Sequence, residues 1–248
     1  MELNDVLGSK TYVREEGAVS YCAPVEYLKP FIDIVDANVI SWSVKVSEPV
    51  SNENPEDHTL NIAYPRVLVE SRFGIDPNLP GFESVIGLIY ALNTRQPIMK
   101  VYSGENVSAC TNLTIFNPEH VFQQDLLGNY RNVYSKAKEY FDNKKKEIEE
   151  FKVIYNQLQN TFLTEEQFHE RMGGILVNAV KSRLGTSPVV QAANMMMDNS
   201  SQYAVRKGND FICNEWNIFN AVTQALNSTD LVLLPTKTIS LAKIFLRL

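Results

Sequence analysis

The sequence is poor in the residues from which metal centres and disulfide frameworks are built. Its 248 residues include three cysteines and three histidines. None of the histidines has a metal-ligand spacing to a cysteine or to another histidine. Cys22, Cys110 and Cys213 are odd in number and widely spaced, which favours reduced thiols in a cytoplasm. We therefore predict no metal site.

The motifs of common catalytic classes are missing as well. The chain has no phosphate-binding P-loop, no glycine-rich dinucleotide fingerprint and no Gly-x-Ser-x-Gly elbow. Cys110 is a candidate nucleophile, but its apolar surroundings favour a buried, unreactive thiol. These absences favour a protein without enzymatic activity and without a cofactor. An active site assembled from distant residues is the alternative.

Long apolar runs and a positive overall charge are also missing. No run approaches the roughly 18 apolar residues that cross a membrane. The first ten residues have neither the basic start nor the apolar core of a secretory signal, so we expect a cytoplasmic protein. The formal net charge is −6. Because proteins that hold nucleic acid by charge are usually basic, a nucleic-acid site here must be a local patch.

Strand patterns dominate the N-terminal half. Alternating apolar and polar residues predict strands over 38–46, 58–73 and, as a pair joined by a turn at Ser103 to Asn106, 96–116. The apolar segment 82–93 fits a strand or a short helix, and the neighbouring strands favour a strand. Pro65 inside the second run indicates an edge strand or a bulge. A short helix is predicted for 23–35, with Pro24 in its first turn. Residues 1–22 are predicted to form an N-terminal arm.

Helical patterns dominate the C-terminal half. Asn117 and Pro118 are typical of an N-cap and a first helical position, so the helical region is predicted to begin there. Thr164 and Gln167 form a capping-box pattern, and Gly173-Gly174 is predicted to break or bend the helix that follows. The remaining predicted helices occupy residues 130–160, 175–184, 188–202, 214–227 and 236–248.

These patterns together predict an α+β fold. A strand-rich N-terminal half forms an antiparallel sheet up to about residue 116, and a helical half over 117–248 packs on it. The length suits one large domain or two small ones. We expect residues 23–248 to form one mixed domain, in which the helical half packs on the sheet.

Basic residues gather in the long predicted helix and in later segments. The helix set is Arg131, Lys136, Lys138, Lys144, Lys145, Lys146 and Lys152, and the later set, in or beside loops, is Lys181, Arg183, Arg206 and Lys207. Tyrosines are interleaved with the helix set, and such a surface suits single-stranded nucleic acid, with charge for phosphates and ring faces for bases. The alternative is a solvated helix whose tyrosines face the core, since nearby carboxylates almost cancel its charge.

The methionine run at 195–197 and the amphipathic C-terminal segment admit a role in association. Methionine side chains adapt to irregular surfaces and are common where proteins bind one another. The chain would then be a homo-oligomer, as a ring or filament subunit. Packing inside the monomer is the alternative.

Two short motifs resemble the phage- and plasmid-encoded domain-of-unknown-function 932 family. The first places glycine, cysteine and asparagine before an apolar strand, as Gly104, Cys110 and Asn112. The second places tryptophan, asparagine and threonine at helical spacing, as Trp216, Asn220 and Thr223. With the charged helix between them, they cover roughly residues 82–248. The resemblance implies a mobile-element origin and a mixed α and β domain, and it implies no catalytic residue.

We therefore expect a non-enzymatic phage or mobile-element protein that binds single-stranded DNA, such as a single-strand annealing or recombination protein. It would act in the cytoplasm of the host cell. The alternative is a structural or protein-interaction component, either a virion subunit or an inhibitor of a host protein, which the acidic composition favours.

Overall fold

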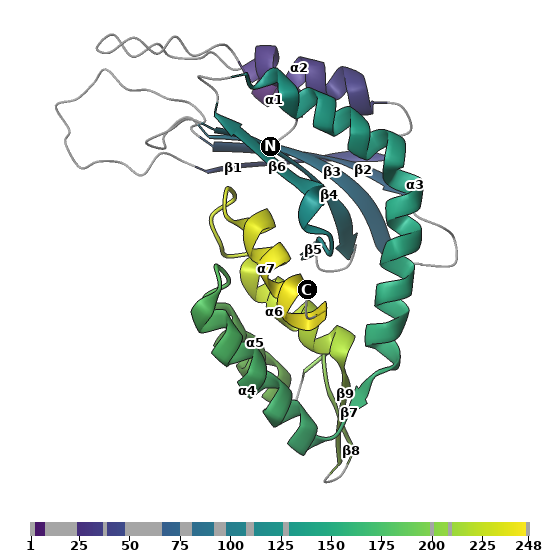
Figure 1. The fold of residues 1–248 in the computed structure, drawn as a ribbon, viewed down its shortest axis with the longest axis vertical. Coiled ribbons are helices and arrows are strands. Elements are labelled where there is room, and N and C mark those ends of the chain that lie inside the picture. Colours follow the sequence, from purple (N-terminus) through teal and green to yellow (C-terminus); the bar gives the residue numbers. More distant parts are fainter. Residues whose placement is uncertain are drawn as a thin grey trace, which may run out of the picture. The chain divides into compact units, whose positions relative to one another are not determined.

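The chain has an α+β fold. The computed structural model describes residues 3–7, 24–36, 39–47, 66–74, 81–91, 98–107, 112–125, 129–198, 201–207 and 210–246. Antiparallel strands occupy the N-terminal half and mainly helices the C-terminal half, which confirms the predicted fold class (Figure 1). The backbone divides into two compact units. Unit 1 is Met1–Gly74, Ser84–Ser103 and His120–Asn143, and unit 2 is Ile75–Glu83, Gly104–Glu119 and Lys144–Leu248.

Unit 1 is built around a sheet. It contains α1 (Leu3–Leu7), α2 (Pro24–Val35), β1 (Ser41–Ser47), β2 (Arg66–Gly74), β6 (Val121–Asp125), most of β3 (Phe82–Ala91) and β4 (Ile98–Val107), and the first part of α3 (Arg131–Asn160). The strand order is β1-β2-β3-β4-β5, with β6 paired to β4. β2 therefore has a neighbour on each side. Of the two alternatives predicted from Pro65, the edge strand is therefore wrong, and the bulge is untested because Pro65 lies outside the described residues.

One face of the unit 1 sheet packs against α2 and α3. The pairing aligns Val44 with Val69, and Val101 with Phe122. Alternate strand residues join the helices in the core, which includes Leu28, Phe31, Val67, Val69, Phe73, Met99, Val101, Val133, Ala137 and Tyr140. Because successive side chains of a strand point to opposite faces, the intervening residues form a second face that points away from α2 and α3.

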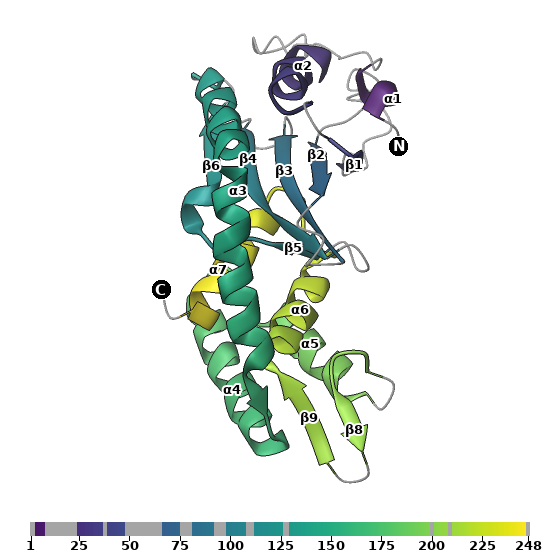
Figure 2. The same ribbon diagram turned by 90° about the vertical axis from the view of Figure 1, so that its right-hand side faces the viewer.

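Unit 2 is mainly helical. It contains β5 (Asn112–Thr114), β7 (Phe162–Leu163), α4 (Glu165–Lys181), α5 (Ser187–Met197), β8 (Val205–Lys207), β9 (Asp210–Asn214), α6 (Glu215–Leu226), α7 (Leu234–Leu246) and the second part of α3. A small sheet has the order β7-β9-β8, and Figure 2 shows β8 beside β9. Aromatic rings fill the core. Tyr155 lies 4.9 Å from Trp216 and 5.0 Å from Phe82, centroid to centroid.

Side-chain caps begin two of these helices. Thr164 Oγ1 accepts a hydrogen bond from the backbone N–H of Gln167, and Gln167 Oε1 accepts one from the N–H of Thr164, which confirms the predicted capping box. Asn214 caps α6 by accepting from the N–H of Asn217 at 2.8 Å. Such caps satisfy donors that the first helical turn leaves unpaired.

The predicted turn at Ser103 to Asn106 is wrong, because β4 runs through it to Val107. Gly104 is a strand residue. A Cβ at this position would lie 2.5 Å from the carbonyl oxygen of Thr114, so only glycine lets β5 approach this closely. Cys110 lies outside the described residues.

The predicted helix at Asn117 is also wrong. Asn117 Oδ1 does accept from the N–H of Glu119 at 2.9 Å, but the cap leads into a single 3₁₀ turn, Pro118–His120. The strand β6 follows and pairs with β4, which satisfies its backbone groups. The continuous helical part begins at α3, close to the predicted start at residue 130.

Gly173 and Gly174 do not interrupt α4, contrary to the prediction. The helix is continuous because its apolar residues recur at helical spacing and are buried, as Phe168, Met172, Ile175 and Ala179. Both glycines are exposed, with open space where a Cβ would stand. Packing of the buried face thus outweighs the low helix propensity of glycine, about 1 kcal/mol per residue.

Candidate functional site

Four lysines of the predicted basic helix pair with carboxylates on the same helix. In α3 the ion pairs are Lys136–Glu139 (2.7 Å), Lys138–Asp142 (3.0 Å), Lys146–Glu150 (3.5 Å) and Lys152–Glu149 (2.6 Å). Residues three or four apart are neighbours on a helix surface, and exposed pairs of this kind contribute only a few tenths of a kcal/mol to about 1 kcal/mol. The acids nevertheless offset the positive charge of the helix locally.

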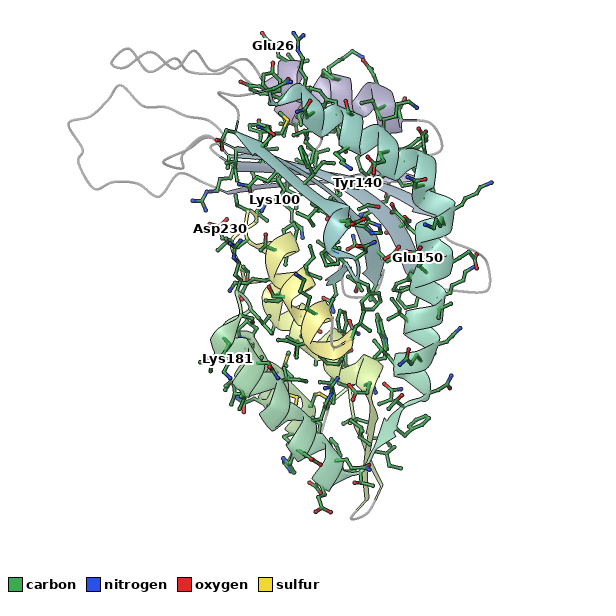
Figure 3. The ribbon with its side chains drawn as sticks, viewed as in Figure 1. Glu26, Lys100, Tyr140, Glu150, Lys181 and Asp230 are labelled. Carbon is green, nitrogen blue, oxygen red and sulfur yellow. The ribbon has the colours of Figure 1, made fainter. Side chains whose placement is uncertain are left out.

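The other predicted cations are dispersed. Four are exposed, namely Arg131 and Lys145 on α3, Lys181 at the end of α4 (Figure 3) and Arg183 just beyond it. Lys144 is half-buried, and burial lowers its pKa. Arg206 and Lys207 lie in the short strand β8, and Lys207 is its last residue. Arg131, Lys136 and Lys138 belong to unit 1 and the rest of the set to unit 2.

The tyrosines of α3, and Tyr130 just before it, make contacts within their own units. Tyr134 donates its O–H to the backbone carbonyl of Tyr27 at 3.0 Å, and Tyr130 packs edge-on against the Tyr27 ring at 5.6 Å. Tyr140 is buried in the unit 1 core, and Tyr155 lies among the aromatic rings of unit 2. These rings therefore contribute to protein packing.

Positive charge gathers instead on the second face of the unit 1 sheet, which we call the cationic sheet face. Strand alternation places four cations there, Lys45, Arg66, Arg72 and Lys100. On β1, β2, β4 and β6 this face carries two carboxylates, Glu70 and Asp125, and Glu83 of β3 has the same strand phase. Lys100 is marked in Figure 3. The four cations and three carboxylates of this face therefore sum to +1, on a chain whose net charge is −6.

The two ends of this face differ in accessibility. Ser41 is exposed on β1, and Lys45, Arg66 and Arg72 are partly exposed on β1 and β2. Lys100 is buried on β4. A ligand that contacts the face from solvent would therefore meet β1 and β2 first.

A buried hydrogen bond organises the inner part of the cationic sheet face. Tyr102 donates its O–H to Glu70 Oε1 at 2.5 Å, and Arg72 Nη2 lies 3.7 Å from Glu70 Oε2. Gly87 makes room for the ring, because a Cβ there would lie 2.2 Å from Tyr102 Cζ. Burial and the neighbouring Glu70 carboxylate raise the pKa of Tyr102 well above its usual range. Tyr102 therefore acts as a hydrogen-bond donor and not as a base.

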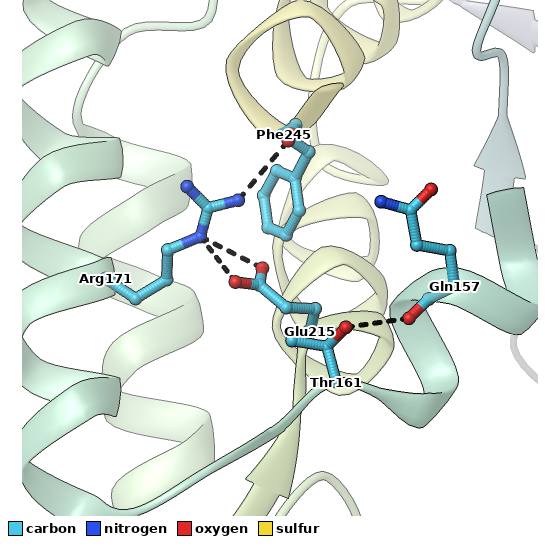
Figure 4. Close-up of polar contacts among 5 residues, drawn as sticks. All are labelled: Gln157, Thr161, Arg171, Glu215 and Phe245. Carbon is cyan, nitrogen blue, oxygen red and sulfur yellow. Dashed lines mark hydrogen bonds and ion pairs between the residues drawn. The ribbon is translucent and has the colours of Figure 1, made fainter. Parts of the chain in front are cut away.

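Unit 2 has a different polar centre, between α4, α6 and α7. Arg171 Nε donates to Glu215 at 2.8–2.9 Å, and Arg171 Nη2 approaches the carbonyl oxygen of Phe245 at 3.5 Å (Figure 4). The guanidinium also lies 4.7 Å from the centroid of the Phe245 ring. One side chain thus joins three helices.

Two cavities adjoin this ion pair, and both are lined by Arg171 and Glu215. One has a volume of about 470 Å³ and extends along α4 past Gln167 and Asn178. The other has a volume of about 410 Å³ and is bounded by Gln157, Thr161 and Leu246. The guanidinium and the carboxylate satisfy each other, so the pair acts mainly as a structural clamp. The nearby Cys213 thiol is not reactive, since burial and Glu215 raise its pKa to about 12.

Three residues that carry the family resemblance, Asn112, Asn220 and Thr223, lie together in unit 2. Asn112 Nδ2 donates to Asn220 Oδ1 at 2.8 Å, and Asn227 Nδ2 donates to Asn112 Oδ1 at 2.8 Å. Thr223 Oγ1 donates to the carbonyl of Asn220 at 2.9 Å. The two bonds of Asn112 attach β5 to α6 and its C-cap, and the Thr223 bond lies within α6. Their role in this chain is structural, and the resemblance itself stays a prediction.

The described part of the chain has no cluster of three or more His, Cys, Asp and Glu side chains that could hold a metal ion. None of its helices combines the length and the apolar character needed to cross a bilayer. No protein-family model, no curated protein and no solved structure matches this chain. Its function is therefore inferred from its residues and their geometry.

Proposed function

We propose that this chain is a non-enzymatic protein that binds single-stranded DNA through the cationic sheet face, as a mobile-element protein of annealing or recombination would. The observation that carries the proposal is the excess of cations on that face, with Lys45, Arg66, Arg72 and Lys100 against Glu70, Glu83 and Asp125. The lysines of α3 lie among acids of their own helix, so that helix has no comparable excess.

The contacts would be made to phosphates. Lys45 and Arg66 lie near each other, because Lys45 pairs with Leu68 and Ser47 pairs with Arg66 in the β1–β2 ladder. Both are partly exposed and can approach a phosphate from solvent. Such contacts release counterions, so affinity should fall steeply with salt and depend little on base sequence.

The test is fluorescence anisotropy of a labelled oligothymidine at several salt concentrations. We expect the double variant Lys45→Ala, Arg66→Ala to weaken binding about tenfold or more and to reduce the salt slope by about 2, since each lost phosphate contact removes about 1. The matched control removes two α3 lysines, Lys136→Ala and Lys138→Ala, and should change affinity less than threefold. Binding lost in the control but kept in the sheet variant would move the site to α3. No binding by the unaltered protein at micromolar concentration would contradict the proposal.

A second candidate function is self-association through the small sheet of unit 2. Val205 and Ile212 are opposite each other in the β8–β9 ladder and are 63% and 46% exposed. Phe162, paired with Asn214 on the same face, is 64% exposed. Exposed apolar side chains gathered on one sheet face often mark an association surface. A second copy of this chain would cover them.

Sedimentation equilibrium tests this second candidate directly. Ile212→Asp should convert an oligomer into a monomer, because it places a charge in an apolar contact. Val177→Asp, at an exposed apolar position of α4, is the matched control and should leave the mass unchanged. A monomeric unaltered protein at high concentration would exclude self-association.

A further inference from the structure

Unit 2 contains a pair of helices joined by a short turn and followed by a β-hairpin (Figure 2). Along the chain, the second part of α3 is followed by β7, α4, α5, β8 and β9, and the small sheet has the order β7-β9-β8. The strand before α4 therefore pairs with the last strand of the hairpin. This is the element order and the strand order of a winged helix, in which a hairpin follows a helix-turn-helix.

The connection between α4 and α5 is short and is held by a buried side chain. It spans residues 182–186, and Gly185 in it has a φ of +75°, a left-handed conformation that favours glycine. Leu184 of the same connection is fully buried. The hairpin is attached as well, because the ring of Phe211 on β9 packs on that of Phe168 on α4, 5.0 Å from centroid to centroid. The two helices and the hairpin therefore pack as one assembly.

The second helix of the pair, α5, has one buried and one exposed face. Its buried residues are Pro188, Val189, Ala192 and Met196. The exposed face is uncharged, and its residues recur three and four positions apart, as Ser187, Val190, Gln191 and Asn194. Val190 is 49% exposed, and the side-chain amides of Gln191 and Asn194 make no hydrogen bond within the described part of the chain. This face is therefore available to a partner.

The exposed side chains of α5 are types that read bases in the major groove of DNA. Glutamine and asparagine pair with the N6 and N7 edge of adenine, and an apolar side chain contacts the methyl group of thymine. In a helix-turn-helix, the second helix lies in the major groove with its N-terminal residues at the base edges. Ser187, Val190 and Gln191 occupy that N-terminal part of α5.

Cations precede and follow α5 in the chain. Lys181 ends α4 and Arg183 lies in the connection, and both are exposed without a carboxylate partner among the described residues. Lys181 is marked in Figure 3. Arg206 and Lys207 lie in β8. Residues 181–207 contain these four cations and a single acidic residue, a net charge of +3 on a chain of −6. Such a local excess suits the phosphates that border a groove.

We propose that this helix-turn-helix binds duplex DNA with α5 in the major groove. Gln191 and Asn194 contact base edges, and Lys181 and Arg183 contact phosphates. The site differs from the cationic sheet face in its position and in its ligand, a duplex and not a single strand, so the two proposals are independent. The competing occupant of the exposed α5 face is a protein partner, and a preference for base sequence distinguishes the two.

The phosphate contacts are tested by fluorescence anisotropy of a labelled random-sequence duplex of about 30 base pairs, roughly three helical turns, at several salt concentrations. We expect the double variant Lys181→Ala, Arg183→Ala to bind about tenfold or more weakly and to reduce the salt slope by about 2. The matched control, Lys145→Ala with Lys146→Ala, removes two exposed lysines of α3 in the same unit and should change affinity less than about threefold. Equal affinities of the two variants, or no duplex binding by the unaltered protein at micromolar concentration, would overturn the proposal.

The base contacts are tested by repeated selection of bound duplexes from the random pool, which should enrich one sequence. On that sequence Gln191→Ala and Asn194→Ala should each weaken binding at least about fivefold, while the affinity for unselected duplexes stays unchanged. Asn156→Ala, at an exposed amide of α3, is the control and should keep the preference. All three positions are exposed, so the variants should fold, and circular dichroism verifies that they do.

Two outcomes of the selection would contradict the assignment of α5. Either no sequence is enriched, or Gln191→Ala and Asn194→Ala keep the preference of the unaltered protein. The exposed face of α5 would then be assigned to a protein partner. Binding of oligothymidine is measured separately, so failure here leaves the single-strand proposal for the cationic sheet face untouched.

Discussion

The two ends of strand β4 place buried carboxylates in opposite environments. In unit 1, Tyr102 of β4 donates a hydrogen bond to Glu70, and Arg72 lies nearby. In unit 2, β4 itself supplies Glu105, whose charged neighbour is another carboxylate, Glu147. The first carboxylate is satisfied by the protein. The pKa of the second is raised by burial and by the neighbouring carboxylate.

This difference shows how one strand can support two roles. A buried carboxylate that has a donor and a cation becomes a fixed part of the fold, because moving it would break a charge-assisted hydrogen bond. A buried carboxylate beside a second carboxylate has a raised pKa, so its protonation depends on pH. We use four predictions to test this comparison.

The largest effects are expected from glycines that make space at each end. Gly87→Ala and Gly104→Ala should each destabilise the protein by about 3 kcal/mol, since the new Cβ would overlap Tyr102 or the Thr114 carbonyl. Urea denaturation measures both. Because the first overlap is with a side chain, Tyr102→Leu should couple to Gly87→Ala by at least about 1 kcal/mol in a double-mutant cycle. Ile115→Ala should not rescue Gly104→Ala, where the overlap is with backbone. Equal coupling at both ends would contradict this account.

The next effect tests whether Glu70 depends on its donor. Tyr102→Phe removes the hydroxyl and leaves a buried carboxylate with one donor fewer, so it should cost about 2 kcal/mol. Thr114→Val, which removes a hydroxyl that has no partner among the described residues, should cost less than about 0.5 kcal/mol. Denaturation of both variants under the same conditions decides the comparison. A Thr114 effect as large as that of Tyr102 would show that its hydroxyl is already satisfied.

A smaller effect is expected at Asn106, also on the unit 2 end of β4. Both side-chain amide atoms are buried without a hydrogen-bond partner among the described residues. Asn106→Leu should therefore stabilise the protein by about 1 kcal/mol, as a rise in the melting temperature. Asn112→Leu is the matched control and should destabilise it, because Asn112 bonds to Asn220 and Asn227. A lower melting temperature in Asn106→Leu would indicate a polar ligand at this position.

The last prediction is a slope with pH. Because the pKa of Glu105 is raised in the folded state, the folded protein binds more protons than the unfolded chain above the ordinary carboxyl pKa. This contribution to stability is therefore lost as pH rises toward the raised pKa. Glu105→Gln should flatten the fall in melting temperature, and its advantage should grow with pH. Glu139→Gln, an exposed control, should keep the slope of the unaltered protein. Parallel curves for the two variants would contradict the shift.

Much of the fold could be predicted from local patterns. The alternation in Ser41–Ser47 and the helical spacing in Arg131–Asn160 come from neighbouring residues, and the structure confirms both elements. The capping box at Thr164 is equally local. Three local predictions are wrong. Pairing with β5 outweighs the turn preference of Ser103 to Asn106, and pairing of β6 with β4 ends the helix predicted at Asn117. Burial of the apolar face of α4 outweighs the helix-breaking tendency of Gly173-Gly174.

The candidate sites, too, depended on tertiary contacts more than on local patterns. Lysines close together in the sequence suggested a basic helix, but acids on the same helix offset them. The cationic sheet face is not visible as a cluster in the sequence because its cations come from different strands. The sequence does place Lys45 on the face of β1 opposite to Trp42 and Val44, because the side chains of a strand alternate.

The sequence by itself determined the α+β class, the positions of most elements and the lack of the usual catalytic motifs, because these depend on residue type and short-range spacing. Tertiary structure alone decided which charges face one another. Lys45 and Arg66 lie on one sheet face, and Glu105 meets Glu147, only because strand register and helix packing bring distant residues together. Electrostatic interaction depends on distance in space and on burial, and neither is a property of sequence neighbours.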